Sequence, residues 1–235
     1  MFIIAHNPFM SAWESSDLIG KLIFVALFGI SLLSWTIMIQ KWWIASRVQQ
    51  ESRLFKRVFF DQHATPLHVS YNRKTHPEAP NAFFLIYDVL QKKTREIFEK
   101  KTNSLAPEDI TLLETHASST ISSITKYLER HLYLLSTIVT LAPFLGLLGT
   151  VYGILITFSG VSLEGTSNQH VLGGLSLALT TTVVGLLNAI PALIGYNYLK
   201  NTISEFDHEM ERFSTEIVST LSLHYRGERC EEKSL

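Results

Sequence analysis

Apolar residues gather in three long blocks that are separated by charged segments. The first block, Leu22 to Gln40, has no charged residue, and Lys21 lies at its edge. From Leu132 to Leu199 the chain carries one formal charge, Glu164, which lies between the second and third blocks. About 20 consecutive apolar residues suffice to cross a bilayer. The pattern therefore predicts an all-α membrane protein with three transmembrane helices, over residues 18–40, 132–158 and 171–198.

The charged segment between the first two spans also shows helical periodicity. Phe83 to Phe98 predicts one helix, and the polar, proline-bearing stretch His63 to Pro80 predicts a loop before it. Pro107 suits the first position of a further helix, and acidic residues follow it in the first turn. Its apolar positions recur at steps of four and three: Leu113, Ala117, Ile121, Ile124, Leu128 and Leu132. Since no Gly or Pro interrupts this register, we predict one continuous helix from about residue 107 to residue 158.

A second apolar stripe continues the third span beyond the membrane. Its members are Leu199, Ile203, Phe206, Met210, Phe213, Ile217 and Leu221. The opposite face carries Glu205, Asp207, Glu209 and Glu211. Two apolar stripes that leave the membrane on the same side favour packing against each other as a coiled-coil-like stem. The alternative is two separate amphipathic helices on the membrane surface, where an anionic leaflet would repel the acidic face.

The distribution of basic residues predicts the orientation in the membrane. Fourteen of the twenty Lys and Arg residues lie between Lys41 and Arg130, and five more follow Leu199. Basic residues favour the cytoplasmic side of a membrane. The expected topology is an external N-terminus (1–17), a cytoplasmic helical region (41–131), an external loop (159–170) and a cytoplasmic C-terminal helix and tail (199–235).

The sequence has no signature of an enzyme. It contains no nucleophile elbow, no Walker loop and no HExxH, and its nine histidines are scattered without the spacing of metal ligands. His131 and His170 lie at the ends of spans, where histidine is typical of the membrane interface. The single cysteine, Cys230, excludes an intrachain disulfide. We therefore expect no catalytic residue, no cofactor and no metal site.

Small residues replace Leu and Val at intervals along the second and third spans. Gly149 and Gly153 are spaced as a small-xxx-small pair, and so are Gly185 and Ala189. This spacing lets another helix approach closely. We predict close helix packing at Gly146, Gly149, Gly153 and Gly185, with local breaks at Pro143 and Pro191.

Threonines and one asparagine are the polar groups of these two spans. A transmembrane threonine commonly bonds back to a carbonyl of its own helix, and we expect this for Thr137, Thr140 and Thr157. Thr180, Thr181 and Thr182 together cover about 200° of the helix, so at least one of them faces protein or water. Hydroxyls without carboxylates, packed among small residues, indicate helices that assemble around a narrow polar path.

Two segments, APFLGLLGTVYGI and LTTTVVGLLNAIPALIGYN, resemble the signature of the MotA/TolQ/ExbB proton channel family. The three spans and the large cytoplasmic segment extend the resemblance over the whole chain. Three spans rather than four argue against the MotA branch. The first span, with Ser34-Trp35 and its Ile39-Gln40-Lys41 exit, resembles the TolQ branch, with ExbB next.

The resemblance implies a homopentamer in the bacterial inner membrane that encloses the helices of two copies of a single-span TolR- or ExbD-like partner. The partner supplies a membrane aspartate, and a TolA- or TonB-like protein spans the periplasm. Proton motive force would then drive envelope maintenance of the Tol–Pal type, with no nucleic acid involved. The matching threonines, Thr150 and Thr182, are implied to line the ion path, and Thr181 and Asn188 are further candidates.

One position departs from the family pattern. The TolQ and ExbB branches usually carry a glutamate five residues before the third-span threonine, and here that residue is Leu177. Two alternatives therefore stay open, namely an ExbB-like subunit that powers TonB-dependent uptake and a non-conducting membrane scaffold. A small-molecule transporter is disfavoured, since the sequence has no inverted repeat and no paired broken helices.

Overall fold

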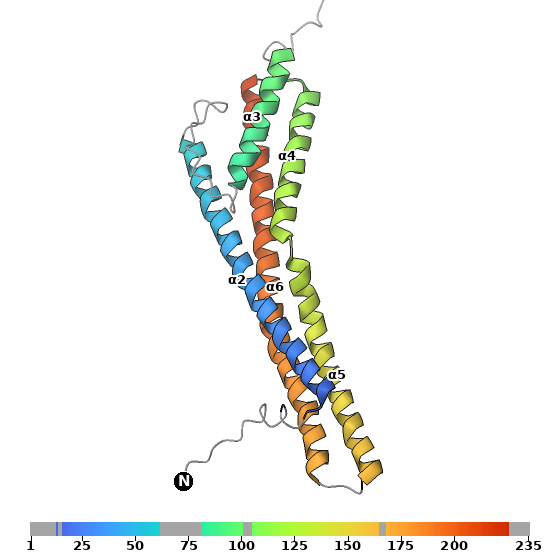
Figure 1. The fold of residues 1–235 in the computed structure, drawn as a ribbon. Helices are drawn as coiled ribbons and strands as arrows, with labels where there is room; N and C mark the ends of the chain where they lie inside the picture. The colour runs from blue at the N-terminus through green and yellow to red at the C-terminus, as the bar shows by residue number, and fades with distance from the viewer. Residues whose placement is uncertain (1–12, 14–15, 62–80, 101–104, 165–167, 226–235) are drawn as a thin grey trace, which may run out of the picture. The chain divides into compact units, whose positions relative to one another are not determined.

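The computed structural model describes residues 13, 16–61, 81–100, 105–164 and 168–225 (Figure 1). These residues form five helices: α2 (Leu18–Asp61), α3 (Ala82–Lys100), α4 (Pro107–Glu129), α5 (Leu132–Glu164) and α6 (Asn168–Tyr225). Three stretches are long and apolar enough to cross a membrane, namely Leu18–Arg57, Leu132–Ser159 and Val171–Tyr225. The all-α class with three membrane-spanning helices is therefore confirmed. The loop predicted over His63 to Pro80 lies outside the described residues.

Contacts divide the chain into two units. The first consists of Met1–Gln40 with His131–Tyr198, and the second of Lys41–Arg130 with Leu199–Leu235. Both α2 and α6 run through the two units as uninterrupted helices. The division falls at the residues where the predicted spans end.

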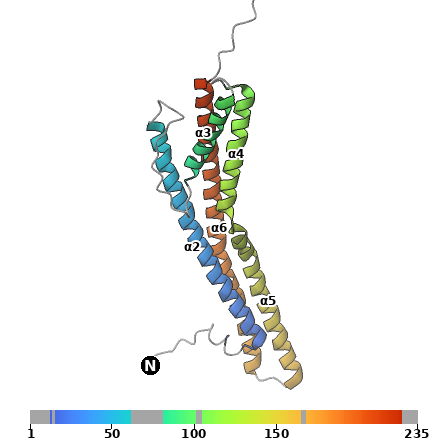
Figure 2. The same ribbon diagram turned by 45° about the horizontal axis from the view of Figure 1, so that its top comes forward.

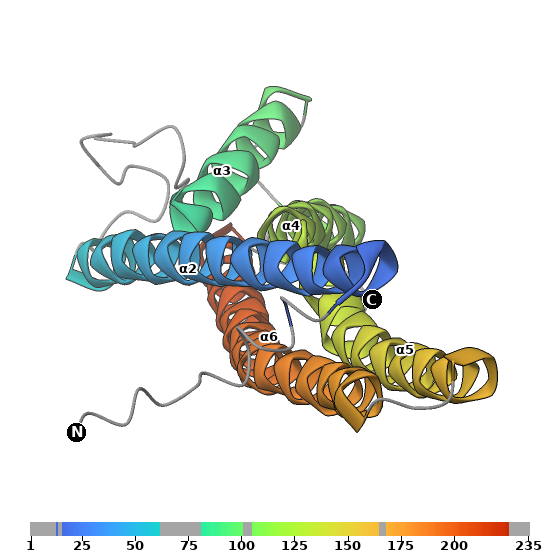
Figure 3. The same cartoon turned by 60° about the horizontal axis from the view of Figure 1, so that its bottom comes forward.

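In the first unit, α5 lies beside the N-terminal half of α6 (Figures 1 and 3). Because α5 reaches Glu164 and α6 begins at Asn168, helix covers most of the segment predicted as a loop over 159–170. Large apolar side chains are turned outward on all three helices, for example Phe28 on α2 and Phe144 on α5, which are 65% and 67% exposed. Outward-facing apolar surface of this extent is typical of helices that contact lipid or other subunits.

In the second unit, α4 runs beside the C-terminal half of α6 (Figures 1 and 2). The predicted stripe of α4 is buried at every position from Leu113 to Leu128, and that of α6 from Leu199 to Leu221. Thr125 Oγ1 on α4 donates a 2.5 Å hydrogen bond to Asp207 Oδ1 on α6. The helical stem predicted from the two stripes is therefore confirmed.

An aromatic cluster attaches α2 and α3 to the stem. The ring of Phe213 on α6 stacks on Phe83 of α3 with centroids 4.7 Å apart. It also meets Phe59 and Phe55 of α2 edge-on, at 5.2 and 6.2 Å. Aromatic pairs at such distances add to the stability that burial alone provides. The cluster thereby fixes one side of α6 against α2 and α3.

The start of α4 follows the sequence prediction. The helix begins at Pro107, and Asp109 Oδ2 accepts a 2.9 Å hydrogen bond from the backbone N–H of Ala106. This bond satisfies a backbone donor that precedes the first turn. A carboxylate here is also stabilised by the positive end of the helix dipole.

The prediction of one continuous helix from residue 107 to residue 158 is wrong. α4 ends at Glu129 and α5 begins at Leu132. Between them His131 has φ of 72°, the left-handed region that non-glycine residues rarely adopt. The carbonyl of Leu128, in the last turn of α4, accepts a 3.0 Å hydrogen bond from Lys41 Nζ. A helix end leaves its last carbonyls without partners in the helix, and Lys41 of α2 supplies a partner for one of them.

Candidate functional site

The candidate site is the interface between α5 and α6 in the first unit. The predicted packing glycines Gly146, Gly149, Gly153 and Gly185 are all buried there. A Cβ atom built at Gly185 would lie 2.7 Å from the carbonyl oxygen of Ala142, closer than real Cβ atoms approach. One built at Gly153 would lie 2.6 Å from the carbonyl oxygen of Gly174. The two backbones are in contact, so glycine is required at these positions.

The middle of this interface brings α5 glycines against α6 threonines. A Cβ atom at Gly149 would overlap the side chain of Thr181. At Gly146 it would lie 3.1 Å from both the carbonyl oxygen of Thr181 and the Cα of Thr182. The small residues of one helix therefore accommodate the polar residues of the other.

The predicted path residues Thr182 and Thr150 differ in their hydrogen bonds. Thr182 Oγ1 reaches across the interface and donates a 3.1 Å hydrogen bond to the carbonyl of Gly146. Thr150 Oγ1 donates to the carbonyl of Leu147 in its own helix, at 2.6 Å. Gly146 and Thr150 are four residues apart and share one face of α5. Thr150 therefore lies one turn beyond Gly146 on α5, and its hydroxyl bonds within that helix rather than across the interface.

The other threonines bond mainly within their own helices. Thr181 is fully buried and donates to the carbonyls of Leu177 and Ala178, both at 3.0 Å. Back-bonding is confirmed where the sequence predicts it: Thr137 donates to Tyr133, Thr140 to Thr137 and Thr157 to Gly153, at 2.8 to 2.9 Å. Thr180 is 8% exposed. All of the triplet 180–182 therefore faces protein to some extent.

The remaining predicted residues are Asn188 and the two prolines. Asn188 Nδ2 donates a 3.0 Å hydrogen bond to the carbonyl of Leu27, which joins α6 to α2 rather than to α5. Pro143 lies inside α5 and Pro191 inside α6, and both helices continue through the proline. Each proline removes one backbone donor, which frees a carbonyl four residues earlier.

One polar contact of the first unit escaped the sequence analysis. Tyr152 on α5 donates its hydroxyl to Asp17 Oδ2, and Asp17 Oδ1 accepts a 2.9 Å hydrogen bond from the backbone N–H of Gly20. An aspartate three residues before a backbone donor at a helix start is a recognisable N-cap signal. The contact with Tyr152, 135 residues away, has no local signal.

Leu177, the position that departs from the family pattern, faces α2. Its side chain is 2% exposed, and a Cβ atom at Gly20 would lie 3.0 Å from Leu177 Cδ2. An apolar side chain suits this buried contact between two helices, where an unpaired carboxylate would be costly.

The chemistry of the site is that of neutral hydrogen-bonding groups. A hydroxyl that donates to a carbonyl keeps lone pairs that accept further hydrogen bonds. In the part of the chain that the structure describes, no three His, Cys, Asp or Glu side chains gather as metal ligands would. The hydroxyls of Thr150 and Thr182 are thus neutral groups that can both donate and accept hydrogen bonds.

Comparison with known proteins identifies the family of the chain. The MotA/TolQ/ExbB proton channel family matches residues 87–212, more than half of the chain. The Tol-Pal system protein TolQ of Haemophilus influenzae is 27% identical over 92% of this chain and 95% of its own length. Biopolymer transport protein ExbB of Pseudomonas putida is 25% identical over 93% of this chain and 65% of its own. A putative biopolymer transport protein, ExbB-like 3, of a Synechocystis species is 30% identical over 77% and 82%. The chain therefore belongs to the MotA/TolQ/ExbB proton channel family.

Proposed function

We propose that this chain is the TolQ-like subunit of an inner-membrane proton channel that couples proton motive force to work across the cell envelope. It acts as a homopentamer with a single-span, TolR-like partner that carries a membrane aspartate. The likeness to the TolQ of Haemophilus influenzae supports this assignment, because it extends over 95% of that protein. The likeness to the ExbB of Pseudomonas putida extends over 65% of the relative.

The observation that carries the proposal is the hydrogen bond from Thr182 to the carbonyl of Gly146. The Thr182 hydroxyl accepts a hydrogen bond from a protonated carboxylic acid while it donates to that carbonyl. After deprotonation the hydroxyl rotates and donates to the carboxylate instead. In this proposal the hydroxyl of Thr150, one turn along α5, hydrogen-bonds the carboxyl group in the same two ways. Neutral groups achieve this without a fixed buried charge, which costs about 3 kcal/mol or more at mid-membrane.

The energy for the coupled movement comes from the proton gradient, at about 2.3 kcal/mol per 100 mV for each proton. In this proposal residues 1–17 and the α5–α6 connection are periplasmic, and the second unit is cytoplasmic. Thr181 and Asn188 take supporting positions, since their hydrogen bonds are made within the subunit. The glycines hold α5 and α6 close enough for the Thr182 bond.

Proton uptake by liposomes under an imposed potential tests the proposal. We expect uptake only when the chain is reconstituted with its single-span partner. Thr182→Val should remove most of this flux, while Thr137→Val, at an exposed hydroxyl that bonds back to Tyr133, should not. Flux that survives both Thr150→Val and Thr182→Val would contradict the assigned path.

A second candidate, a non-conducting scaffold, is favoured by Leu177, whose position gives the third span no carboxylate of its own. An assembled complex with the partner and no proton flux would support the scaffold. Complementation in cells distinguishes the TolQ-like function from the ExbB-like alternative. A TolQ-type subunit should restore envelope integrity to a strain lacking its own TolQ, whereas an ExbB-type subunit should restore TonB-dependent uptake to a strain lacking its own ExbB.

A further inference from the structure

Two tryptophans and an arginine lie on α2 soon after its uncharged segment. That segment, Leu22 to Gln40, is followed by Trp42, Trp43 and Arg47. Trp42 and Trp43 are 54% and 44% exposed. Tryptophan is typical of the level of the lipid headgroups, and basic residues are typical of the cytoplasmic side of a membrane. The three residues therefore have the chemistry of a helix that passes from lipid into the cytoplasm.

The side chain of Arg47 folds back over the ring of Trp43. Its Cζ atom lies 4.0 Å from the ring centroid, as in a cation–π pair. Because residue 43 precedes residue 47 by four positions, this contact draws the guanidinium back by about one turn, or about 5.4 Å along the helix. The positive charge is thereby held at the level of the exposed tryptophans rather than further out in the cytoplasm.

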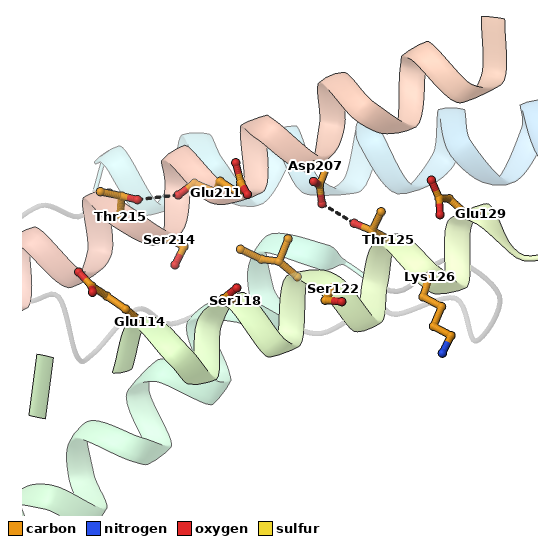
Figure 4. A pocket seen from close by; sticks show the side chains of 11 residues that line it. Glu114, Ser118, Ser122, Thr125, Lys126, Glu129, Asp207, Glu211, Ser214 and Thr215 are labelled. Atoms are coloured by element: carbon orange, nitrogen blue, oxygen red, sulfur yellow. Dashed lines mark hydrogen bonds between the residues drawn. The ribbon is translucent and has the colours of Figure 1, made fainter. Parts of the chain in front are cut away.

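Arg47 forms no ion pair with any of the described residues. Glu51 lies one turn further along α2, and yet the guanidinium turns the other way, toward Trp43. Other carboxylates of the second unit, such as Asp207 and Glu211, line a cavity whose walls come from α4 and α6 (Figure 4). A guanidinium offers five N–H donors and binds phosphate groups through paired hydrogen bonds. Arg47 is therefore available for an anion from outside the chain.

The face of α2 that carries Trp43 is apolar along the preceding span. Val25, Leu32 and Ile39 recur at steps of seven on this face, and Trp43 follows four residues later. These three aliphatic side chains are 55 to 61% exposed, whereas Ala45, on the opposite face, is buried. Helices that contact other helices in a membrane use small residues, while large aliphatic side chains suit lipid tails. The face thus offers contacts to acyl chains and, at its end, a cation for the headgroup.

The charges around Arg47 favour a headgroup with net negative charge. From Lys41 to Arg57, α2 carries five basic residues and one acidic residue. Lys41 is already bound to the carbonyl of Leu128, so four basic residues are left. A cluster of this size beside a membrane span is typical of recognition of anionic lipids. The choline of a zwitterionic lipid would bring a further cation among these like charges.

We propose that Arg47 and Trp43 bind the headgroup of an anionic phospholipid. The guanidinium donates two hydrogen bonds to the phosphate oxygens, and the acyl chains run along the apolar face of α2. The lipid belongs to the cytoplasmic leaflet, an assignment that rests on the orientation in the proposed function, whereas the binding chemistry does not. A lipid bound in this way fixes the depth at which α2 leaves the membrane.

Thermal unfolding of the purified full-length chain in detergent, followed by circular dichroism, tests this site. The probe is dioleoylphosphatidylglycerol, and dioleoylphosphatidylcholine and inorganic phosphate are added in parallel samples. A ligand that binds the folded chain raises the unfolding midpoint as its concentration increases. Phosphatidylglycerol should do so more strongly than the other two. Arg47→Gln should weaken the apparent affinity for phosphatidylglycerol by about tenfold, because charge-assisted hydrogen bonds to the phosphate are lost.

Arg57→Gln is the matched control, since it removes the same charge from another exposed position of α2. Residue 57 lies ten residues beyond residue 47, which is about 15 Å along the helix and more than the Debye length of about 8 Å. Its replacement should change the affinity by less than about twofold. Arg47→Lys keeps the charge without the paired donors and should give an intermediate affinity. Each variant is compared with its own midpoint without lipid, so a change in intrinsic stability does not enter.

Several results would overturn the proposal. Equal stabilisation by the two lipids would remove the preference for an anionic headgroup, and equal stabilisation by inorganic phosphate would make the ligand a soluble anion. Equal losses in Arg47→Gln and Arg57→Gln would show a diffuse attraction in place of a site. If Arg47→Gln lost oligomers in chemical crosslinking and kept its lipid affinity, this face would be a contact between copies of the chain.

The lipid site and the proposed function are tested separately, because the lipid measurements need neither the partner nor a proton gradient. Partner-dependent proton flux in a chain without preference for phosphatidylglycerol would remove the lipid site alone. Lipid binding that depends on Arg47, in a chain that conducts no protons with its partner, would keep the lipid site and favour the scaffold.

Discussion

Thr182 on α6 and Gly146 on α5 are joined by a hydrogen bond that depends on the absence of a side chain at residue 146. Thr182 Oγ1 lies 3.1 Å from the Gly146 carbonyl oxygen. A Cβ atom at Gly146 would itself lie 3.1 Å from Thr182 Cα. Helix packing and the placement of the hydroxyl are therefore one property of the α5–α6 interface, and a change in either should affect the other.

Thr181→Val and Thr182→Val should differ in their effect on proton flux, because the two hydroxyls make different hydrogen bonds. Of these two hydroxyls, that of Thr182 is the one that bonds across the interface, to α5. Thr182→Val removes it, and we expect partner-dependent proton flux in liposomes to fall at least about tenfold. Thr181→Val keeps the volume of a buried side chain whose hydroxyl bonds its own helix. Its flux should stay within about twofold of the unchanged protein. Equal losses in the two variants, at equal assembly, would contradict the assignment.

Gly185 and Gly29 form a matched pair for testing helix contact. A Cβ atom at Gly185 would lie 2.7 Å from the carbonyl oxygen of Ala142, whereas one at Gly29 would meet nothing within 4 Å. Gly185→Ala should therefore force α5 and α6 apart and destabilise the protein by about 1 to 3 kcal/mol. Gly29→Ala should be neutral or slightly stabilising. Thermal unfolding in detergent, followed by circular dichroism, measures both, and similar midpoints would refute the packing argument.

The sequence specified much of this fold because local patterns coincide with tertiary contacts. The steps of four and three from Leu113 to Leu128 mark one face of a helix, and that face is the buried one. Small-xxx-small spacing marked Gly149 and Gly153, since only small residues let backbones touch. Which side of each helix meets which neighbour was not encoded locally, so the contact between Asn188 and α2 was not foreseen.

The break between α4 and α5 shows why the prediction of a continuous helix was wrong. Arg130 and His131 are neither glycine nor proline, and the apolar register continues through them to Leu132. The structure nevertheless has His131 at φ of 72°. Lys41, more than 80 residues away in the sequence, hydrogen-bonds the carbonyl of Leu128. A helix end whose partner comes from a distant segment leaves no signal in its own sequence.

Asn188 should serve helix attachment rather than conduction. Its side-chain amide donates to the carbonyl of Leu27, so Asn188→Leu removes one hydrogen bond between α6 and α2. Such bonds within membranes contribute about 0.6 to 1.7 kcal/mol, and we expect a loss of stability in that range. Proton flux per assembled complex should be unchanged. A variant of normal stability that has lost its flux would place Asn188 on the ion path instead.

Lys41 should stabilise the end of α4 by a charge that is held in a fixed position. Its side chain is 8% exposed, and Nζ donates a 3.0 Å hydrogen bond to the carbonyl of Leu128. A cation at a helix C-terminus stabilises the helix dipole and the unsatisfied carbonyls, by about 1 to 2 kcal/mol in partly buried geometries. Lys41→Met keeps the length of the side chain and removes the charge. We expect that loss of stability, with faster amide hydrogen exchange in residues 126–129.

Lys92→Met is the matched control for this lysine. Lys92 pairs with Asp88 at 2.7 Å on α3, but its side chain is 69% exposed, so solvent screens the pair. Its removal should change stability by only about 0.3 kcal/mol and leave exchange in α4 unaltered. Denaturant unfolding of the two variants in the same detergent compares them directly. If Lys92→Met proved as destabilising as Lys41→Met, burial at the end of α4 would not be what gives Lys41 its effect.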